Sequence, residues 1–135
     1  MSAEQLLGSA NFGNSVVIAD LEAGIGTLTR LDNELIDIVV VVVEPTPRSM
    51  GVAQRAIELA RERAHGRVII VGNRVMDVAD EQRLRAYFPN VEMIVVPLDP
   101  AVSDADRLGL SPFDTAPAGP AVQALAALAD LVAAG

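Results

Sequence analysis

Four short runs of aliphatic residues divide the chain and predict the strands of a sheet. They are Val16–Ala19, which ends at Asp20, then Ile36–Val43, Arg67–Val71 and Val91–Val96. None of them alternates between apolar and polar positions, and an unbroken aliphatic run is typical of a strand buried on both faces. The hydrophobic pattern therefore predicts about four strands inside a layered fold.

Apolar residues between these runs recur with the spacing of amphipathic helices. The stretch Ser49–Ala64 carries such a stripe, with Ser49 as the expected N-cap. Further helices are expected over 79–88 and over the alanine- and leucine-rich stretch 121–134. Strands that alternate with helices across short connections form parallel sheets. We therefore expect an α/β fold of three layers, with a mostly parallel sheet flanked by helices.

Length and charge limit the organisation and the partners of the chain. With 135 residues it has the length of a single domain, divided into an N-terminal segment 1–15 and a folded part 16–135. The net charge of −8 disfavours a nucleic-acid groove and docking on anionic membranes. The longest apolar run is Ile38–Val43, which is too short to span a bilayer, and the first residues carry no basic region. We expect a cytoplasmic protein.

Cysteine and lysine are absent from the sequence, and their absence excludes several kinds of chemistry. There is no cysteine, which excludes disulfides, thiol catalysis and cysteine-ligated metals. All ten basic residues are arginine, so the chain has no lysine to bind a phosphate or to form a Schiff base. The single histidine, His65, lies at a helix end beside Gly66, where it reads best as a cap.

Polar or conformationally special residues follow each of the four predicted strands. In open parallel sheets, ligands bind beyond the carboxyl ends of the strands, so these residues are the candidates for a site. They could equally be turn residues and helix caps, and Arg48 and Arg74 could contact an anion there. The four segments are Asp20-Leu21-Glu22-Ala23-Gly24, Glu44-Pro45-Thr46, Gly72-Asn73-Arg74 and Pro97-Leu98-Asp99.

Taken in order, these segments resemble MinD/ParA-type P-loop NTPases, and most of all the maturation factors of carbon monoxide dehydrogenase. The resemblance runs from about residue 16 to the C-terminus. Val17–Ile25 is similar to the Walker B and switch II segment, and Val43–Ser49 to the strand and turn that follow in the family. Val71–Val75 resembles an Asn-Lys-Val signature with Arg74 in place of lysine. Pro97–Asp99, with Asp106–Gly109, is similar to the loop over the adenine.

The resemblance implies roles for residues at the strand ends and implies ATP or ADP with Mg²⁺ as ligands. Asp20 would hold a water bound to Mg²⁺, and the Gly24 amide would donate to the γ-phosphate. Asn73 would bind the adenine edge through its planar amide, with Arg74 beside it. Pro97 and Asp99 would belong to the adenine loop. On the residues alone, Asp20 could instead be a cap and Asn73 a turn residue.

The sequence departs from the family in lacking a glycine-rich loop with its lysine. Gly8–Ser15 has the spacing of such a loop, with Asn14 at the lysine position. A strand is expected after it, whereas a P-loop follows a strand and opens a helix, so we interpret the match as coincidence. Catalysis of phosphoryl transfer depends on positioning the phosphates and neutralising their charge, which is the work of the loop and its lysine. We therefore expect no ATPase activity from this chain alone, and its domain reads as a truncated P-loop NTPase-like fold.

In the family, the strand that carries the P-loop lies between those corresponding to Val16–Asp20 and Ile36–Val43. Without it, two rows of backbone groups would lack partners. Two solutions are open: the two strands pair directly, which we favour for a monomer, or another chain inserts a strand.

Three hypotheses about function follow. The first is a non-hydrolysing binding or regulatory module with at most weak adenine-nucleotide binding. The second is an ATP-dependent metallocentre maturation protein completed by a partner chain that supplies a P-loop. The third is a structural homodimer without a ligand, in which the alanine-rich segment 121–131 forms the dimer face.

Overall fold

The computed structural model describes residues 11, 13–21, 36–63 and 66–135. Its sheet has three strands, β1 (Ile38–Val43), β2 (Arg67–Val75) and β3 (Glu92–Pro97), all parallel and in the order β1-β2-β3. The α/β class and the parallel sheet predicted from the sequence are confirmed, with three strands in place of about four.

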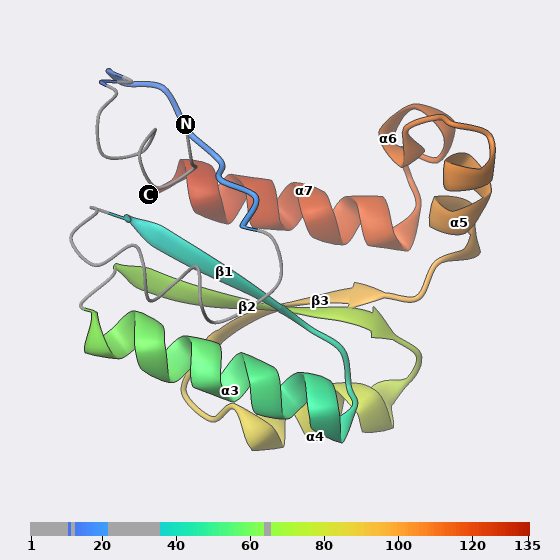
Figure 1. Cartoon of the computed structure of the whole chain (residues 1–135). Helices are drawn as coiled ribbons and strands as arrows, with labels where there is room; N and C mark the ends of the chain where they lie inside the picture. The colour runs from blue at the N-terminus through green and yellow to red at the C-terminus, as the bar shows by residue number, and fades with distance from the viewer. Residues whose placement is uncertain (1–10, 12, 22–35, 64–65) are drawn as a thin grey trace.

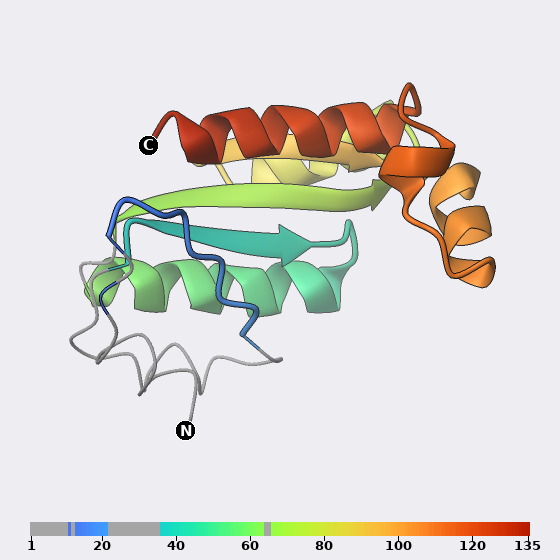
Figure 2. The ribbon, with the colours of Figure 1, turned by 90° about the horizontal axis from the view of Figure 1, so that it is seen from above.

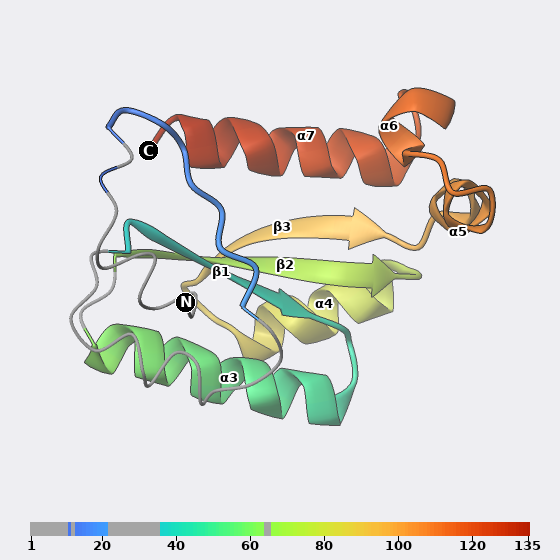
Figure 3. The ribbon, with the colours of Figure 1, turned by 45° about the horizontal axis from the view of Figure 1, so that its top comes forward.

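Helices cover the two faces of the sheet unequally (Figure 1). Seen from above (Figure 2) and from an angle between the two views (Figure 3), α3 and α4 lie on one face and α7 on the other, while α5 and α6 lie beyond the arrowheads of the strands. The helices in the described ranges are α3 (Pro47–Glu62), α4 (Val78–Tyr87), α5 (Pro100–Arg107), α6 (Pro112–Thr115) and α7 (Pro120–Ala133). Within the described ranges, no helix is long and apolar enough to cross a membrane.

Two hydrophobic clusters hold the layers together, one on each face of the sheet. The larger packs α3 and α4 against the sheet and contains the predicted apolar stripe of α3, with Ala60 also buried. The smaller is centred on Val71, Val96 and Ala121 and packs α7 against β2 and β3. Burying a Val or Ile side chain contributes roughly 1.5–3 kcal/mol, so these largely aliphatic clusters, to which Phe88 adds a buried aromatic ring, account for the layering.

Short polar side chains determine where the helices begin. Thr46 caps α3 by accepting a hydrogen bond from the Ser49 N–H at 3.3 Å, so the expectation that Ser49 is the N-cap is wrong. The Ser49 hydroxyl instead accepts from the Glu44 N–H at 2.9 Å. Asp77 caps α4 in the same way. Caps of this kind contribute about 1 kcal/mol each.

The expected strand over Val16–Asp20 is not present. Residues 15–21 have no regular secondary structure, and the side chains of Val16 and Ile18 are 69% and 85% exposed. The favoured direct pairing of this segment with Ile36–Val43 is therefore also wrong. β-branched composition indicates a preference for strands, but a strand needs a hydrogen-bonding neighbour and a face to bury. Among the described residues this segment has no ladder neighbour, and its valine and isoleucine side chains are largely exposed.

The hydrogen bonds between β1 and β2 show which side of β1 is open. The Arg67 N–H donates to the Asp37 carbonyl at 2.8 Å, and Ile38 lies opposite Arg67. In a parallel ladder, alternate residues of a strand face the same neighbour, so the odd-numbered residues of β1 bond to β2. The backbone groups of Ile38, Val40 and Val42 consequently point away from β2, toward the open edge.

Candidate functional site

The carboxyl ends of the three strands meet at one edge of the sheet, as the parallel topology requires. Val43 lies opposite Gly72 and Val75 opposite Pro97, so the residues that follow β1 lie beside the end of β2, which in turn lies beside the end of β3. Arg74 forms an ion pair with Glu44 across the first junction, at 3.6 Å between Nη1 and Oε1. Three of the four predicted segments are thus brought to this edge.

Arg74 has an unusual backbone conformation at the centre of this edge. Its φ is +56°, a left-handed value that few residues other than glycine adopt, and the β2–β3 register shifts between Gly72 and Val75. Such irregularities at strand ends often redirect a side chain at a functional site. The bend exposes the Arg74 side chain, whose charge is shared with Glu44.

Asn73 lies beside this bend and is half buried. Within the described part of the chain, its side-chain amide makes no hydrogen bond with another residue. A planar amide with a free donor and a free acceptor is suited to the edge of a nucleobase. The structure therefore leaves Asn73 available for the contact that the sequence predicted, and the contact itself stays a prediction.

Asp99 is buried at the end of β3, where its carboxylate joins two helices. One oxygen accepts from the Ala101 N–H at 3.0 Å and caps α5, and the other accepts from the Ala121 N–H at 3.3 Å, at the start of α7. A Cβ at Gly119 would lie 3.0 Å from the second oxygen, so glycine keeps this approach open. The carboxylate is occupied by these helix starts, which gives Asp99 a structural role that the sequence suggested only as an alternative.

The predicted Mg²⁺ and phosphate contacts do not fit the described residues. Asp20 is exposed and lies outside any strand, and Gly24 falls outside the described residues, as does His65. In the parts of the chain that the structure describes, no three acidic or histidine side chains gather where they could hold a metal ion. Residues 8–10 and 12 of the segment Gly8–Ser15 also lie outside the described residues. We therefore derive no step through Mg²⁺ or the phosphates.

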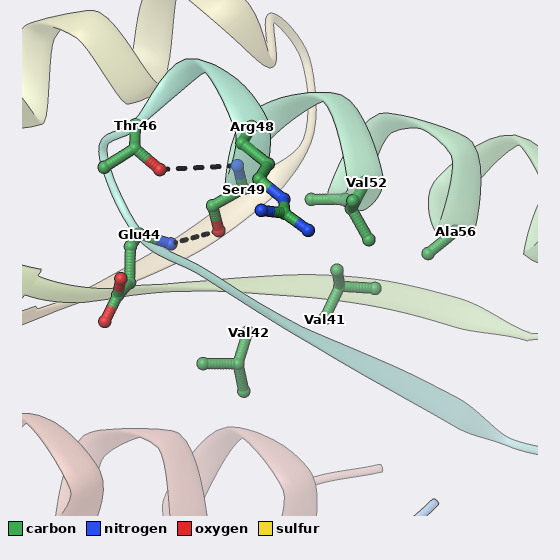
Figure 4. Close-up of a pocket in the computed structure, with 9 residues that line it drawn as sticks. Val41, Val42, Glu44, Thr46, Arg48, Ser49, Val52 and Ala56 are labelled. Atoms are coloured by element: carbon green, nitrogen blue, oxygen red, sulfur yellow. Dashed lines mark hydrogen bonds between the residues drawn. The ribbon is translucent and has the colours of Figure 1, made fainter. Parts of the chain in front are cut away.

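A groove that the sequence did not indicate runs between the outer strand β1 and helix α3 (Figure 4). Its volume is about 380 Å³. Val52 and Ala56 project from α3 toward β1, and Arg48 lies near one end beside Thr46 and Ser49. A groove at a sheet edge depends on which strand is outermost, and a single sequence does not show strand order.

At the opposite end of the sheet, the strand starts are joined by an exposed ion pair. The Arg67 Nε donates to Glu92 Oε2 at 2.7 Å, and a second guanidinium nitrogen contacts the other carboxylate oxygen. These hydrogen bonds lower the pKa of Glu92 and raise that of Arg67. Arg67 also donates to the Leu131 carbonyl at 3.4 Å, which ties the last turns of α7 to β2.

Comparison with known proteins supports the resemblance found in the sequence. No family model matches the chain. Over 103 residues, or 76% of its length, the chain is 31% identical to the carbon monoxide dehydrogenase accessory protein CooC of Rhodospirillum rubrum. It spans 39% of the length of that protein. The match confirms the resemblance to the maturation factors of carbon monoxide dehydrogenase.

Proposed function

We propose that these 135 residues form a binding module, related to the carbon monoxide dehydrogenase accessory proteins, that contacts adenine nucleotides weakly and does not hydrolyse ATP by itself. The observation that carries the proposal is the half-buried Asn73 amide, which is free of hydrogen bonds to described residues and lies at the carboxyl edge of the sheet. The resemblance of the strand-end segments to those of MinD/ParA-type NTPases supports a nucleotide as the ligand class.

The contacts at this edge suit a base better than a triphosphate. Asn73 offers a donor and an acceptor near the end of β2, while Arg74 already shares its charge with Glu44. The sequence contains no lysine to neutralise β- and γ-phosphates. Binding carried by the base alone predicts similar affinities for ADP and ATP and little dependence on Mg²⁺.

Calorimetric titration of the chain with ADP and ATP, with and without Mg²⁺, tests this proposal. We expect saturable binding that weakens about tenfold in Asn73→Ala, the loss of roughly one good hydrogen-bonding side chain. Gln82→Ala, an exposed amide on α4, is the matched control and should bind as the parent does. Absence of binding would overturn the proposal, and so would ATP turnover by the purified chain.

A second candidate function follows from the fraction of CooC that the chain spans, which is 39%. In this alternative the chain is part of an ATP-dependent maturation protein, and another segment or chain supplies the P-loop. Copurification separates the two candidates. A polypeptide with a glycine-rich, lysine-bearing loop should accompany the chain and confer ATP hydrolysis only in the second case.

A further inference from the structure

Three exposed apolar side chains lie where α5 is joined to α6, outside both hydrophobic clusters of the fold. Leu108 is 71% exposed, Leu110 is 53% exposed and Phe113 is 51% exposed. We call these three residues the apolar turn. Helices α5 and α6 extend beyond the carboxyl ends of the strands, away from the layers that cover the sheet (Figures 1 and 2). Single exposed apolar residues are common, whereas several along one turn indicate a binding surface.

Phe113 is notable because aromatic residues are scarce in this protein, at 3% of the sequence. Of the two phenylalanines in the described ranges, Phe88 is buried in the larger cluster, whereas the ring of Phe113 is half exposed. Aromatic side chains are enriched at protein interfaces and often carry much of the binding energy. The position of Phe113 outside the core therefore favours a role in binding.

Hydrogen bonds hold the backbone of the apolar turn in one conformation. Gly109 has a φ of +67°, the left-handed value that commonly ends a helix, and its N–H donates to the Asp106 carbonyl at 3.0 Å. The Leu110 N–H donates to the Ala105 carbonyl at 2.9 Å, which completes a Schellman motif. The exposed side chains are thus presented by a defined structure, and a partner would spend little free energy on ordering them.

The amides that follow the turn are also bonded within the chain. The Phe113 N–H donates to the Ser111 hydroxyl at 3.2 Å, and the N–H groups of Asp114 and Thr115 each donate to the Ser111 carbonyl at 3.1 Å. A partner is therefore recognised through side chains and not by pairing with a strand. A helix satisfies its own backbone and presents an apolar stripe, so it is the element that suits this surface.

The charge around the apolar turn is negative. Residues 98–135 contain five aspartates and one arginine, Arg107, which is paired with Asp104 at 3.3 Å. Asp106 in the last turn of α5 and Asp114 in α6 are exposed, and neither forms an ion pair with another residue that the structure describes. These two carboxylates favour a partner that carries lysine or arginine beside its apolar residues.

The arginines at the carboxyl edge of the sheet do not supply these carboxylates with a counter-charge. Arg74 is paired with Glu44 after β1, and Arg48 lies at the groove between β1 and α3. α5 instead follows β3, and β2 separates β3 from β1. A second copy of this chain would bring the same aspartates to the interface, so charge disfavours self-association through the apolar turn.

We propose that the apolar turn binds a basic amphipathic helix of another protein. The apolar stripe of that helix covers the three exposed side chains, and its lysines or arginines lie near Asp106 and Asp114. This interaction goes beyond nucleotide binding and does not use the Asn73 amide.

A designed peptide tests the proposal on the full chain. The probe is Lys-Leu-Ala-Lys-Leu-Leu-Lys-Ala-Leu-Lys-Lys-Leu-Ala-Lys, capped at both ends, whose leucines fall on one face of a helix. It is titrated into isotope-labelled protein while the backbone amide signals are followed by NMR, and we expect saturable shifts at Leu108, Leu110 and Phe113. Two control peptides, one with the leucines spread around the helix and one with Glu at every Lys, should each bind at least about tenfold more weakly.

Alanine variants test whether the apolar side chains carry the binding. Leu108→Ala and Phe113→Ala should each weaken peptide binding by about fivefold to tenfold, because each removes apolar area from the centre of the contact. Val78→Ala, at a side chain on α4 that is 69% exposed, is the matched control and should bind within about twofold of the parent. Urea unfolding read by circular dichroism verifies the fold of the variants. Asn73→Ala should leave peptide binding unchanged, which separates this proposal from nucleotide binding.

A pair of charge variants separates local from overall electrostatics. Asp106→Asn and Asp130→Asn remove the same charge, one beside the apolar turn and the other on α7. Asp106→Asn should weaken peptide binding by about threefold, and Asp130→Asn should have a smaller effect. Equal effects would mean that the peptide responds only to the net charge of the protein, which would contradict the proposal.

Several other results would overturn the proposal. One is the absence of saturable shifts at millimolar peptide, and another is binding that Phe113→Ala and Leu108→Ala leave unchanged. Dimerisation of the free chain that Phe113→Ala abolishes, measured by light scattering, would assign the apolar turn to a second copy. Binding to phosphatidylcholine vesicles that the same variant abolishes would assign it to a lipid surface.

Discussion

The two outer strands of the sheet end in edges of opposite character. β3 begins with Glu92 in an ion pair with Arg67, ends with Pro97 and lies under α7. β1 has neither a charge nor a proline, and α7 leaves the same face of it exposed. A strand that forms a permanent edge carries protection against pairing. The comparison indicates that β3 is suited to be an edge, whereas β1 is suited to the interior of a wider sheet.

The largest loss of stability is expected from a substitution in the buried face of α3, the helix that packs against β1. Ile57 is 1% exposed and belongs to the cluster that joins α3 to the sheet. Ile57→Ala should lower the free energy of unfolding by about 2–5 kcal/mol, because it removes buried methylene groups and leaves a cavity. Urea unfolding measures this change.

Val52 on the same helix provides the control for this prediction. It is 52% exposed on the groove side, so Val52→Ala should change the free energy of unfolding by less than about 0.5 kcal/mol. Equal losses in the two variants would mean that the groove side of α3 is as well packed as its core side.

A smaller loss is expected at the end of β3, where Asp99 joins α5 and α7. Asp99→Ala leaves the N–H groups of Ala101 and Ala121 without their acceptors, which should cost about 1–3 kcal/mol in thermal or urea unfolding. Ser111→Ala removes the cap of the short helix α6 and is the comparison, with an expected loss below about 1 kcal/mol. Equal losses of stability in the two variants would contradict the proposal that Asp99 stabilises the starts of both α5 and α7.

The same Val→Thr substitution on both outer strands tests whether α7 covers β3 and leaves β1 exposed. Val96 and Val42 are on the same face of the sheet, at 5% and 62% exposure. Val96→Thr should cost about 1–3 kcal/mol, because it places a hydroxyl under α7, and Val42→Thr should cost less than about 0.5 kcal/mol. Equal costs would show that the outer face of β1 is covered in solution.

The smallest effect is expected from pH at the exposed ion pair on β3. The pKa of Glu92 is lowered by the hydrogen bonds from Arg67, so the folded state binds this proton less readily than the unfolded chain. The pair therefore contributes stability above the unfolded pKa of about 4.3, and the contribution is lost as pH falls through the lower folded value.

Glu92→Gln isolates this contribution. We expect the variant to be slightly less stable than the parent at neutral pH and the two unfolding midpoints to converge in acid. A difference that stays constant down to low pH would assign the effect to packing. High salt at neutral pH should reduce the difference, because exposed pairs are screened.

Much of the fold could be predicted from the sequence, because its strands and helices follow local patterns. The unbroken runs at Ile38–Val43 and around Ile69 identify buried strands, and the stripe of α3 identifies its packed face. Pro100 and Asp99 mark the start of α5, a proline after a capping residue, yet that helix was not predicted as an element. Val16–Ala19 has the same composition as a strand, but the described part of the chain gives it no strand to pair with. Composition indicates a preference for the strand conformation, whereas a strand in a sheet also requires a neighbouring strand to which it can hydrogen-bond.

The candidate site was only partly predictable for the same reason. The sequence places Asn73 and Arg74 just after a strand that ends at Val71, whereas β2 continues through both residues to Val75. Their position near the carboxyl edge of the sheet still follows from the local pattern. The sequence does not reveal that Asp99 reaches Ala121, 22 residues away along the chain, or that Glu44 pairs with Arg74. These contacts depend on the register of the sheet and on the path of α7.

The attachment of α7 at both of its ends has a consequence for how this layer can move. Asp99 holds the Ala121 amide at the first turn, and Arg67 holds the Leu131 carbonyl near the last. A helix that is hydrogen-bonded to the rest of the fold at only one end can detach progressively from its other end. A helix that is held at both ends cannot detach in this way. α7 should therefore leave the sheet in a single cooperative event, and its amides should exchange with solvent together and not progressively from one terminus.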